Sequence, residues 1–183
     1  MAVSTPSATT SMSSSPQRLT ILDKVHIGSD TKAMTATLLA MFVEQGKIKW
    51  GTTIAEVFPE LGEKIHADYR GVTLEQLLTH RGGVPTDLSA NGLWAKLWAH
   101  AGTPTEQRRT LLEGVVAAPP AAKPGEKFVY ANAGYAIAGH MAETLAAKPW
   151  ESLMQEKLFG PLGMTSAGFG APGDPKLVDQ PWG

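Results

Sequence analysis

Residues 28–36 read Gly-Ser-Asp-Thr-Lys-Ala-Met-Thr-Ala, and they open the most apolar helix that the sequence predicts. Ser29 falls at the N-terminus of this helix, where backbone N–H groups are unpaired and the helix dipole favours developing negative charge. Lys32 follows one turn later on the same helical face, so its amine can approach the Ser29 hydroxyl. A serine hydroxyl is a poor nucleophile until a neighbouring group withdraws its proton. The pattern Ser-x-x-Lys therefore supplies a nucleophile and an activating partner from one helical turn.

The same stretch also fits a structural hypothesis. Ser and Asp are preferred helix caps, so Ser29 or Asp30 can cap the helix while Lys32 is a solvated cation. With Ser and Lys each at roughly 6–7% of residues, the spelling arises about once by chance in a chain of this size. A second motif favours chemistry, because the only Ser-x-x-Lys of the chain is followed by its only Tyr-x-Asn, Tyr130-Ala131-Asn132.

Three segments resemble the penicillin-recognising serine hydrolases, which comprise class C-type beta-lactamases, DD-peptidases and related esterases. Residues 28–36 resemble the nucleophile helix of that family, residues 71–84 its Leu-Leu-Thr-His-Thr-Ser-Gly segment, and residues 128–135 its second active-site motif. The likeness runs in family order from about Ile21 to Gly183. It implies an α+β fold of the beta-lactamase/transpeptidase type.

The resemblance also implies roles for four residues. Ser29 would attack the substrate carbonyl and form an acyl-enzyme, with Lys32 and Tyr130 jointly acting as base and proton relay. Asn132 would hold the substrate amide and steady Lys32. The implied substrate is a small-molecule ester, amide or beta-lactam, and the family chemistry needs no cofactor and no metal.

One family feature has no counterpart in this sequence. The third motif, Lys-Thr-Gly or His-x-Gly on a β-strand, does not occur after Asn132, and the His-x-Gly spellings at residues 80–82 and 100–102 precede Tyr130. In the family, that strand supplies half of the oxyanion hole. We therefore expect a mainly α-helical chain with most of the antiparallel sheet missing, which as a fragment is weakly active or inactive. The alternative is a non-catalytic helical binding or interaction module that keeps the motif as a helix cap.

Composition narrows the remaining function classes. The formal net charge of −1 over 183 residues gives no electrostatic case for nucleic acid or an anionic membrane. The absence of Cys excludes disulfides and thiolate catalysis, and the five His show no metal-binding spacing. No apolar run is long enough to span a bilayer and no secretory signal is recognisable, so the location of the protein is left open.

Domain organisation is expected to be simple. Residues 1–16 are almost wholly Ser, Thr, Ala, Pro and Met, so we expect a disordered extension, followed by a partial serine hydrolase domain over residues 17–183. Loss of the sheet would expose apolar faces of the helices, which favours self-association.

Local patterns predict where helices begin and end. A helix over residues 31–45 is ended by Gly46, and further helices are expected over residues 54–57, from 74, near 91–100, from 104, over 133–146 and over 150–158. Thr73 and Thr103 begin capping boxes, and Asn132 is expected to cap the helix that follows it. Residues 128–130 are β-prone.

Three aromatic side chains invite structural predictions. Trp94 and Trp98 lie at helical spacing with Leu97, which predicts a stripe of core residues rather than a ligand platform. His80 has no identifiable catalytic partner in the sequence. We therefore expect it to pack and form hydrogen bonds at its turn rather than to act as a base.

Overall fold

The structure is a computed structural model that describes residues 24–89 and 92–170. The predicted extension over residues 1–16 lies outside the described residues. Contacts divide the chain into two units, one formed by residues 27–167 and the other by residues 1–26 with 168–183. All helices described below belong to the first unit.

Helices dominate the described residues, as predicted, and no strand occurs among them. One isolated antiparallel bridge joins Thr53 to Thr73. The elements are α1 (Asp30–Glu44), α2 (Ile54–Val57), the 3₁₀ segment η1 (Pro59–Lys64), α3 (Ala67–Arg70), α4 (Leu74–Leu78), α5 (Leu93–Trp98), α6 (Pro104–Val116), α7 (Asn132–Ala146), α8 (Trp150–Met154) and the π-helical turn η3 (Gln155–Phe159). The short elements η1 and α3 were not expected from the sequence.

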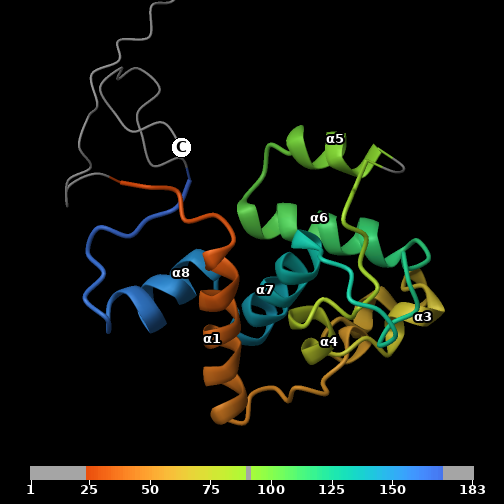
Figure 1. Ribbon diagram of the computed structural model, residues 1–183, viewed down its shortest axis with the longest axis horizontal. Helices are drawn as coiled ribbons and strands as arrows, with labels where there is room; N and C mark the ends of the chain where they lie inside the picture. Colours follow the sequence, from red (N-terminus) through yellow and green to blue (C-terminus); the bar gives the residue numbers. More distant parts are fainter. Residues whose placement is uncertain (1–23, 90–91, 171–183) are drawn as a thin grey trace, which may run out of the picture. The chain divides into compact units, whose positions relative to one another are not determined.

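Helix α7 is the centre of this unit. It contacts α1, α2, α4, α6 and α8, and Figure 1 shows it between α1 and α6. Nine of its fifteen residues are buried, and most of these are small or aliphatic. A helix that is apolar on most sides must be covered on most sides. The composition of α7 therefore explains why the other helices gather around it.

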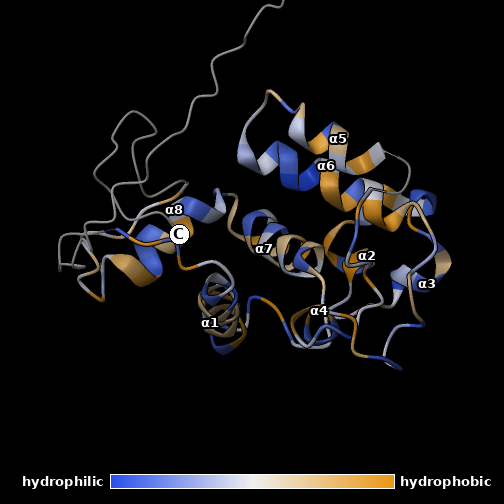
Figure 2. Ribbon diagram, turned by 45° about the horizontal axis from the view of Figure 1, so that its top comes forward, coloured by the Kyte–Doolittle hydropathy of each residue, from blue (hydrophilic) through white to orange (hydrophobic). Residues whose placement is uncertain are grey.

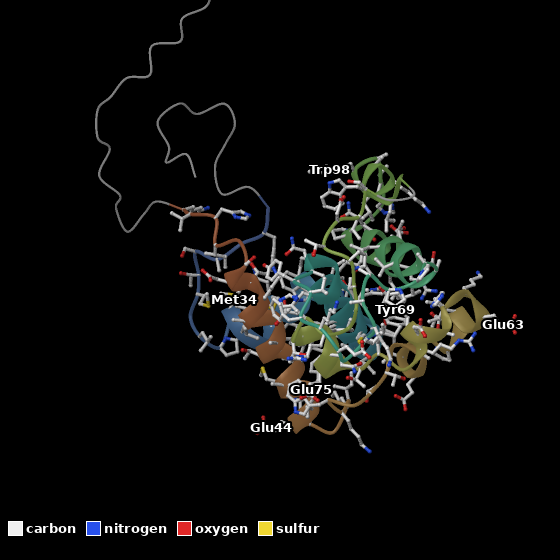
Figure 3. The ribbon with its side chains drawn as sticks, turned by 45° about the vertical axis from the view of Figure 1, so that its right-hand side comes forward. Met34, Glu44, Glu63, Tyr69, Glu75 and Trp98 are labelled. Carbon is white, nitrogen blue, oxygen red and sulfur yellow. The ribbon has the colours of Figure 1, made fainter. Side chains whose placement is uncertain are left out.

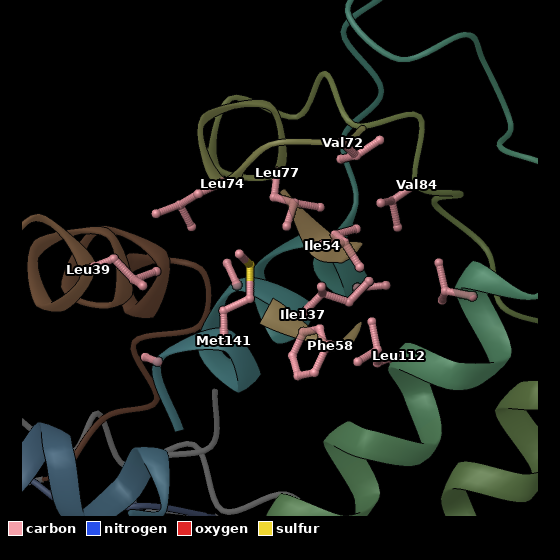
Figure 4. Close-up of a cluster of buried hydrophobic side chains, with 14 of the residues drawn as sticks. Leu39, Ile54, Phe58, Val72, Leu74, Leu77, Val84, Leu112, Ile137 and Met141 are labelled. Atoms are coloured by element: carbon pink, nitrogen blue, oxygen red, sulfur yellow. The ribbon is translucent and has the colours of Figure 1, made fainter. Parts of the chain in front are cut away.

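The core joins α7 to both flanking groups of helices. Ile137 and Met141 of α7 lie in one cluster with Leu39 of α1 and Leu112 of α6 (Figure 4). The same cluster contains side chains from the connecting region, namely Ile54, Phe58, Val72, Leu74, Leu77 and Val84. Burial of each large apolar side chain contributes about 1.5–3 kcal/mol relative to exposure. This packing fixes the start of α7 relative to α1.

Three capping boxes lie at the starts of helices. The boxes of Thr73 and Thr103 were predicted, and a third box lies at Thr53, before the predicted helix over residues 54–57. Thr53, Thr73 and Thr103 each accept a hydrogen bond from the backbone N–H three residues later. The side chains of Glu56, Gln76 and Glu106 accept the N–H of the cap residue in return. These reciprocal bonds need only neighbours in sequence, which is why pattern alone locates them.

Two predictions about helix α5 and helix α7 are wrong. Helix α7 begins at Asn132 itself, and Ala131 occupies the cap position, so Asn132 does not cap it. In α5 only Leu97 is buried, whereas Trp94 and Trp98 are 47% and 77% exposed. The two indoles instead form an edge-to-face pair with centroids 5.9 Å apart, and Figure 3 shows Trp98 projecting from the ribbon.

The exposure of the two Trp residues follows from how α5 meets α6. Leu93 lies against Gly114, where an added Cβ would come within 2.5 Å of the Leu93 side chain. This close approach turns Leu93 and Leu97 inward on a helix of only six residues. Hydropathy also changes along α6, from hydrophilic residues at its start to apolar residues at its end (Figure 2).

A buried carboxylate links α6, α7 and α8 near the other end of α7. The Glu143 side chain, only 2% exposed, accepts hydrogen bonds from Arg108 at 2.6 Å, His140 at 2.7 Å, Thr105 at 2.8 Å and the Trp150 N–H at 2.8 Å. Burial by itself raises the pKa of Glu143, but the hydrogen bonds from His140 and Arg108 outweigh burial and lower this pKa to about 2. Glu143 is therefore ionised and fully paired.

The substitution Glu143→Gln should lower the free energy of unfolding by about 1–3 kcal/mol at neutral pH, because Arg108 keeps its pair with Glu151 but the buried donors around residue 143 lose a charged acceptor. Urea denaturation measures the loss. Glu113→Gln is the matched control, since Glu113 forms an exposed pair with Arg109 within α6 and should cost only about 0.5 kcal/mol. Equal losses in the two variants would contradict this assignment.

The pH dependence of the same variant has a defined sign. The pKa of Glu143 in the folded chain lies below its ordinary value of 4.5, so its stabilisation is complete above 4.5 and is lost as the pH falls toward 2. The difference in unfolding free energy between the wild-type chain and Glu143→Gln should therefore narrow over that interval.

Candidate active site

Ser29 lies immediately before α1, in a turn set by Gly28. Gly28 has a φ of +51°, and the carbonyls of Ile27 and Gly28 accept the N–H groups of Asp30 and Thr31 at 3.1 and 3.3 Å. Ser29 occupies the cap position, yet no side-chain capping bond is formed there. The hypothesis that the motif survives as a helix cap is therefore wrong in this structure.

The Ser29 hydroxyl instead faces two other polar groups. Its Oγ accepts a hydrogen bond from Lys32 Nζ at 2.9 Å and lies 2.8 Å from Tyr130 Oη. Both distances fall in the range that proton transfer between a nucleophile and its base requires. Ser29 therefore has one cationic donor, Lys32, that favours loss of its proton, and one neighbouring hydroxyl oxygen, that of Tyr130, that can take the proton when ionised.

Lys32 connects the two parts of the site. Its Nζ donates a second hydrogen bond to Asn132 Oδ1 at 2.7 Å, across 100 positions of sequence. The same ammonium lies 4.9 Å from the ring centroid of Tyr130 and 5.8 Å from that of Tyr135. Two hydrogen-bond acceptors and two aromatic faces thus define where this charge sits.

Tyr130 belongs to an extended segment that leads into α7. The residues there are β-prone in sequence but have no strand partner among the described residues. The Tyr130 carbonyl accepts a 2.6 Å hydrogen bond from the Thr86 hydroxyl. The neighbouring Lys32 ammonium, and after it the hydrogen bond to Ser29, lower the pKa of Tyr130. A lowered pKa makes the phenolate more accessible, so Tyr130 can accept and return a proton.

The four residues singled out in the sequence thus form one connected chain of hydrogen bonds, Tyr130–Ser29–Lys32–Asn132. Sequence reasoning missed Thr86 and assigned no role to Tyr135. Tyr135 donates a hydrogen bond to the Leu78 carbonyl at 2.8 Å, which anchors its ring beside Lys32. No sequence motif surrounds Thr86, so no signal in the sequence pointed to it. Tyr135 lies within the second motif, residues 128–135, and this position could have identified it.

His80 packs and forms hydrogen bonds at its turn, as predicted. Its Nδ1 accepts the Ala131 N–H at 3.2 Å, and its ring lies 4.5 Å from that of Tyr130 between centroids. These partners come from a segment about fifty residues away, so the sequence could not identify them.

Two further properties concern metals and membranes. Across residues 24–89 and 92–170, no group of three or more His, Cys, Asp or Glu side chains is placed to hold a metal ion. Within the same ranges, no helix combines the length and hydropathy that crossing a membrane would require.

The Beta-lactamase family model matches residues 16–182, which includes every residue of the hydrogen-bonded chain. The chain belongs to the Beta-lactamase family. An unguisins hydrolase from Aspergillus violaceofuscus is 33% identical over 144 residues, covering 75% of this chain and 24% of the relative. Penicillin-binding protein 4 from Amycolatopsis lactamdurans is 27% identical over 137 residues, covering 75% of this chain and 34% of the relative.

Solved structures agree on the fold of this Beta-lactamase-family chain. The octameric penicillin-binding protein homologue from Pyrococcus abyssi superposes with a TM-score of 0.59 at 27% identity, covering 76% of this chain and 31% of that structure. The chain thus has a beta-lactamase/transpeptidase-like fold represented here mainly by helices. It spans between about a quarter and a third of the length of the two curated relatives above.

The chain contains three Tyr residues, which makes the proton affinity of Tyr130 measurable. Burial raises the pKa of Tyr69 and of Tyr135, whereas that of Tyr130 is lowered, so Tyr130 should ionise first. A pH titration followed at the tyrosinate absorption band should show one Tyr ionising at a lower pH than the other two, and this ionisation is called the early step. Tyr130→Phe should remove this step, and Lys32→Met should move it to higher pH. An early step that persists in Tyr130→Phe would disprove the assignment.

Proposed function

We propose that this chain carries the acyl-transfer centre of a serine hydrolase that forms an acyl-enzyme on Ser29. The observation that supports it is the position of Ser29 Oγ, which lies 2.9 Å from Lys32 Nζ and 2.8 Å from Tyr130 Oη. The helix cap hypothesis does not require this arrangement, because a capping serine bonds its own helix rather than a residue 101 positions away.

The proposed acylation follows from the contacts. Ser29 Oγ attacks the carbonyl carbon as its proton passes to the Lys32–Tyr130 pair, and a C–O bond forms. The tetrahedral intermediate then collapses, the bond to the leaving nitrogen or oxygen breaks, and Tyr130 returns the proton to that atom. Water attacks the acyl-enzyme by the reverse proton route and releases the acid. The charged oxygen of the intermediate would lie near the start of α1, where the Ser29 N–H and the helix dipole favour negative charge.

The proposed roles of the other two residues differ. Lys32 holds positive charge beside Ser29 and Tyr130 and so favours loss of a proton from either hydroxyl. Asn132 Oδ1 accepts a hydrogen bond from Lys32 Nζ, which leaves the Asn132 amide NH₂ group available for a substrate carbonyl. In this proposal Asn132 fixes both the lysine and the acyl part of the substrate.

The proposed substrates are a small-molecule ester, amide or beta-lactam. The unguisins hydrolase and the penicillin-binding protein among the relatives support hydrolytic and penicillin-binding chemistry on this framework. We also propose self-association through exposed apolar side chains. The exposed apolar side chains that motivate this proposal include Trp98, Leu162 and Phe128, which are 77%, 69% and 63% exposed.

Incubation with a fluorophosphonate or a penicillin should add one adduct mass to the intact chain, because Ser29 is the hydroxyl with an activating pair. Intact-mass spectrometry measures the adduct. Ser29→Ala should abolish it, whereas Ser166→Ala, which changes an exposed serine outside the site, should not. An adduct of equal yield on Ser29→Ala would contradict the assignment of the nucleophile.

Turnover by this chain alone should be slow with p-nitrophenyl acetate or nitrocefin. The family motif that supplies the second oxyanion donor is missing after Asn132, and loss of one such donor costs about 10²–10³ in rate. Colorimetric assays with Ser29→Ala as background measure the effect. Turnover at ordinary enzyme rates, about 1–10³ per second, that disappears in Ser29→Ala would show that another group supplies the donor.

A further inference from the structure

His80 has an unusual backbone conformation directly beside the site. Its φ is +57°, a left-handed value that costs a residue with a side chain roughly 1–2 kcal/mol. His80 follows α4 and Thr79, where the chain turns toward the segment that carries Tyr130. A residue other than glycine keeps a left-handed backbone conformation only where the surrounding structure holds it there. The contacts of His80 show which interactions this backbone conformation makes possible.

Two hydrogen bonds join His80 to the backbone on either side of Tyr130. The His80 carbonyl accepts the Val129 N–H at 2.8 Å, and His80 Nδ1 accepts the Ala131 N–H at 3.2 Å. In extended chain, alternate N–H groups point to the same edge. One residue therefore satisfies both donors on one edge of this segment, while the Thr86 hydroxyl binds the Tyr130 carbonyl on the other edge at 2.6 Å.

The imidazole ring of His80 also packs against aromatic side chains of this segment and of α7. Its centroid lies 4.5 Å from that of Tyr130, 5.2 Å from that of Tyr135 and 5.4 Å from that of Phe128. Tyr130 and Tyr135 are also the two rings that flank the Lys32 ammonium. His80 thus contacts the groups that surround the lysine.

We propose that His80 is a positioning residue, which sets the register of Tyr130 and Asn132 against Ser29 and Lys32 by accepting the N–H groups of Val129 and Ala131. With the N–H groups of Val129 and Ala131 held, the Tyr130 hydroxyl can reach Ser29 Oγ by side-chain rotation alone. The catalytic consequence rests on the proposed function of Ser29. A displacement of about 1 Å in such a site can cost about 10²-fold in rate.

This role requires a neutral imidazole, because Nδ1 must carry a lone pair toward the Ala131 N–H. Burial, and after it the nearby Lys32 charge, lower the pKa of His80 and so favour the neutral form. The titratable groups that contact its ring are Tyr130 and Tyr135.

Two substitutions separate the acceptor from the rest of the residue. Asn tolerates a left-handed backbone, and its Oδ1 lies one bond beyond Cγ, as does Nδ1 of His, so His80→Asn keeps the acceptor and loses the ring. His80→Gly keeps the backbone conformation and loses both. His80→Gln carries the same amide one bond farther out, and it serves as the second loss variant if the glycine variant does not fold.

The readouts are the Tyr130 step in the tyrosinate titration, the rate of Ser29 adduct formation by intact mass, and the thermal midpoint. His80→Gly and His80→Gln should move the Tyr130 step to higher pH and slow adduct formation about 10²-fold. His80→Asn should retain the low Tyr130 step and most of the rate. A general loss of stability would lower the midpoint without this pattern of rescue.

The inference is overturned if His80→Asn loses as much as His80→Gly, since the ring would then be the support. It is also overturned if folded His80→Gly or His80→Gln leaves both the Tyr130 step and the adduct rate unchanged. Absence of any Ser29 adduct on the wild-type chain would refute the proposed function instead. The tyrosinate titration would still decide the role of His80 in that case.

Discussion

The site depends on the hydrogen bonds of the Lys32 ammonium, because they join two segments that lie 100 positions apart in the sequence. The ammonium donates to Ser29 beside its own helix and to Asn132 at the start of α7. Neither bond alone would bring Tyr130 to Ser29. Together they require that α1 and α7 pack with their first turns adjacent, which the shared core of Leu39, Ile137 and Met141 provides.

Helix α7 carries different polar networks at its two ends. Its first residue, Asn132, faces the ammonium of Lys32, whereas Glu143, eleven residues later, faces Arg108 and His140 inside the protein. The two networks differ in how far they are buried. The buried Glu143 is surrounded by donors and has its pKa lowered to about 2, which keeps it charged and fixed. The hydroxyls of the site remain more exposed, as Tyr130 at 40% shows, which the proposed function requires for access of a substrate.

The segment over residues 128–131 shows how a chain without strand pairing in the described residues can still hold an extended conformation. His80 binds one edge through its carbonyl and its Nδ1, and the Thr86 hydroxyl binds the other, so one turn residue and two side chains take the place of neighbouring strands. This arrangement requires only a few hydrogen-bonding groups to be placed accurately. They also make the geometry of Tyr130 sensitive to single residues far from it in sequence.

The sequence by itself determined the parts that depend on neighbours along the chain. Ser29 and Lys32 meet within one helical turn, and the boxes begun by Thr73 and Thr103 form among residues three apart. Only the tertiary structure decided that Asn132 does not cap α7, that Trp98 lies outside the core, and that His80 Nδ1 accepts the Ala131 N–H. The reason is physical. A cap or an i,i+3 pair is defined by backbone geometry that every helix shares. The other three outcomes depend on which faces pack together, and the partners range from Gly114 against Leu93 of α5 to Lys32 against Asn132, 100 positions apart.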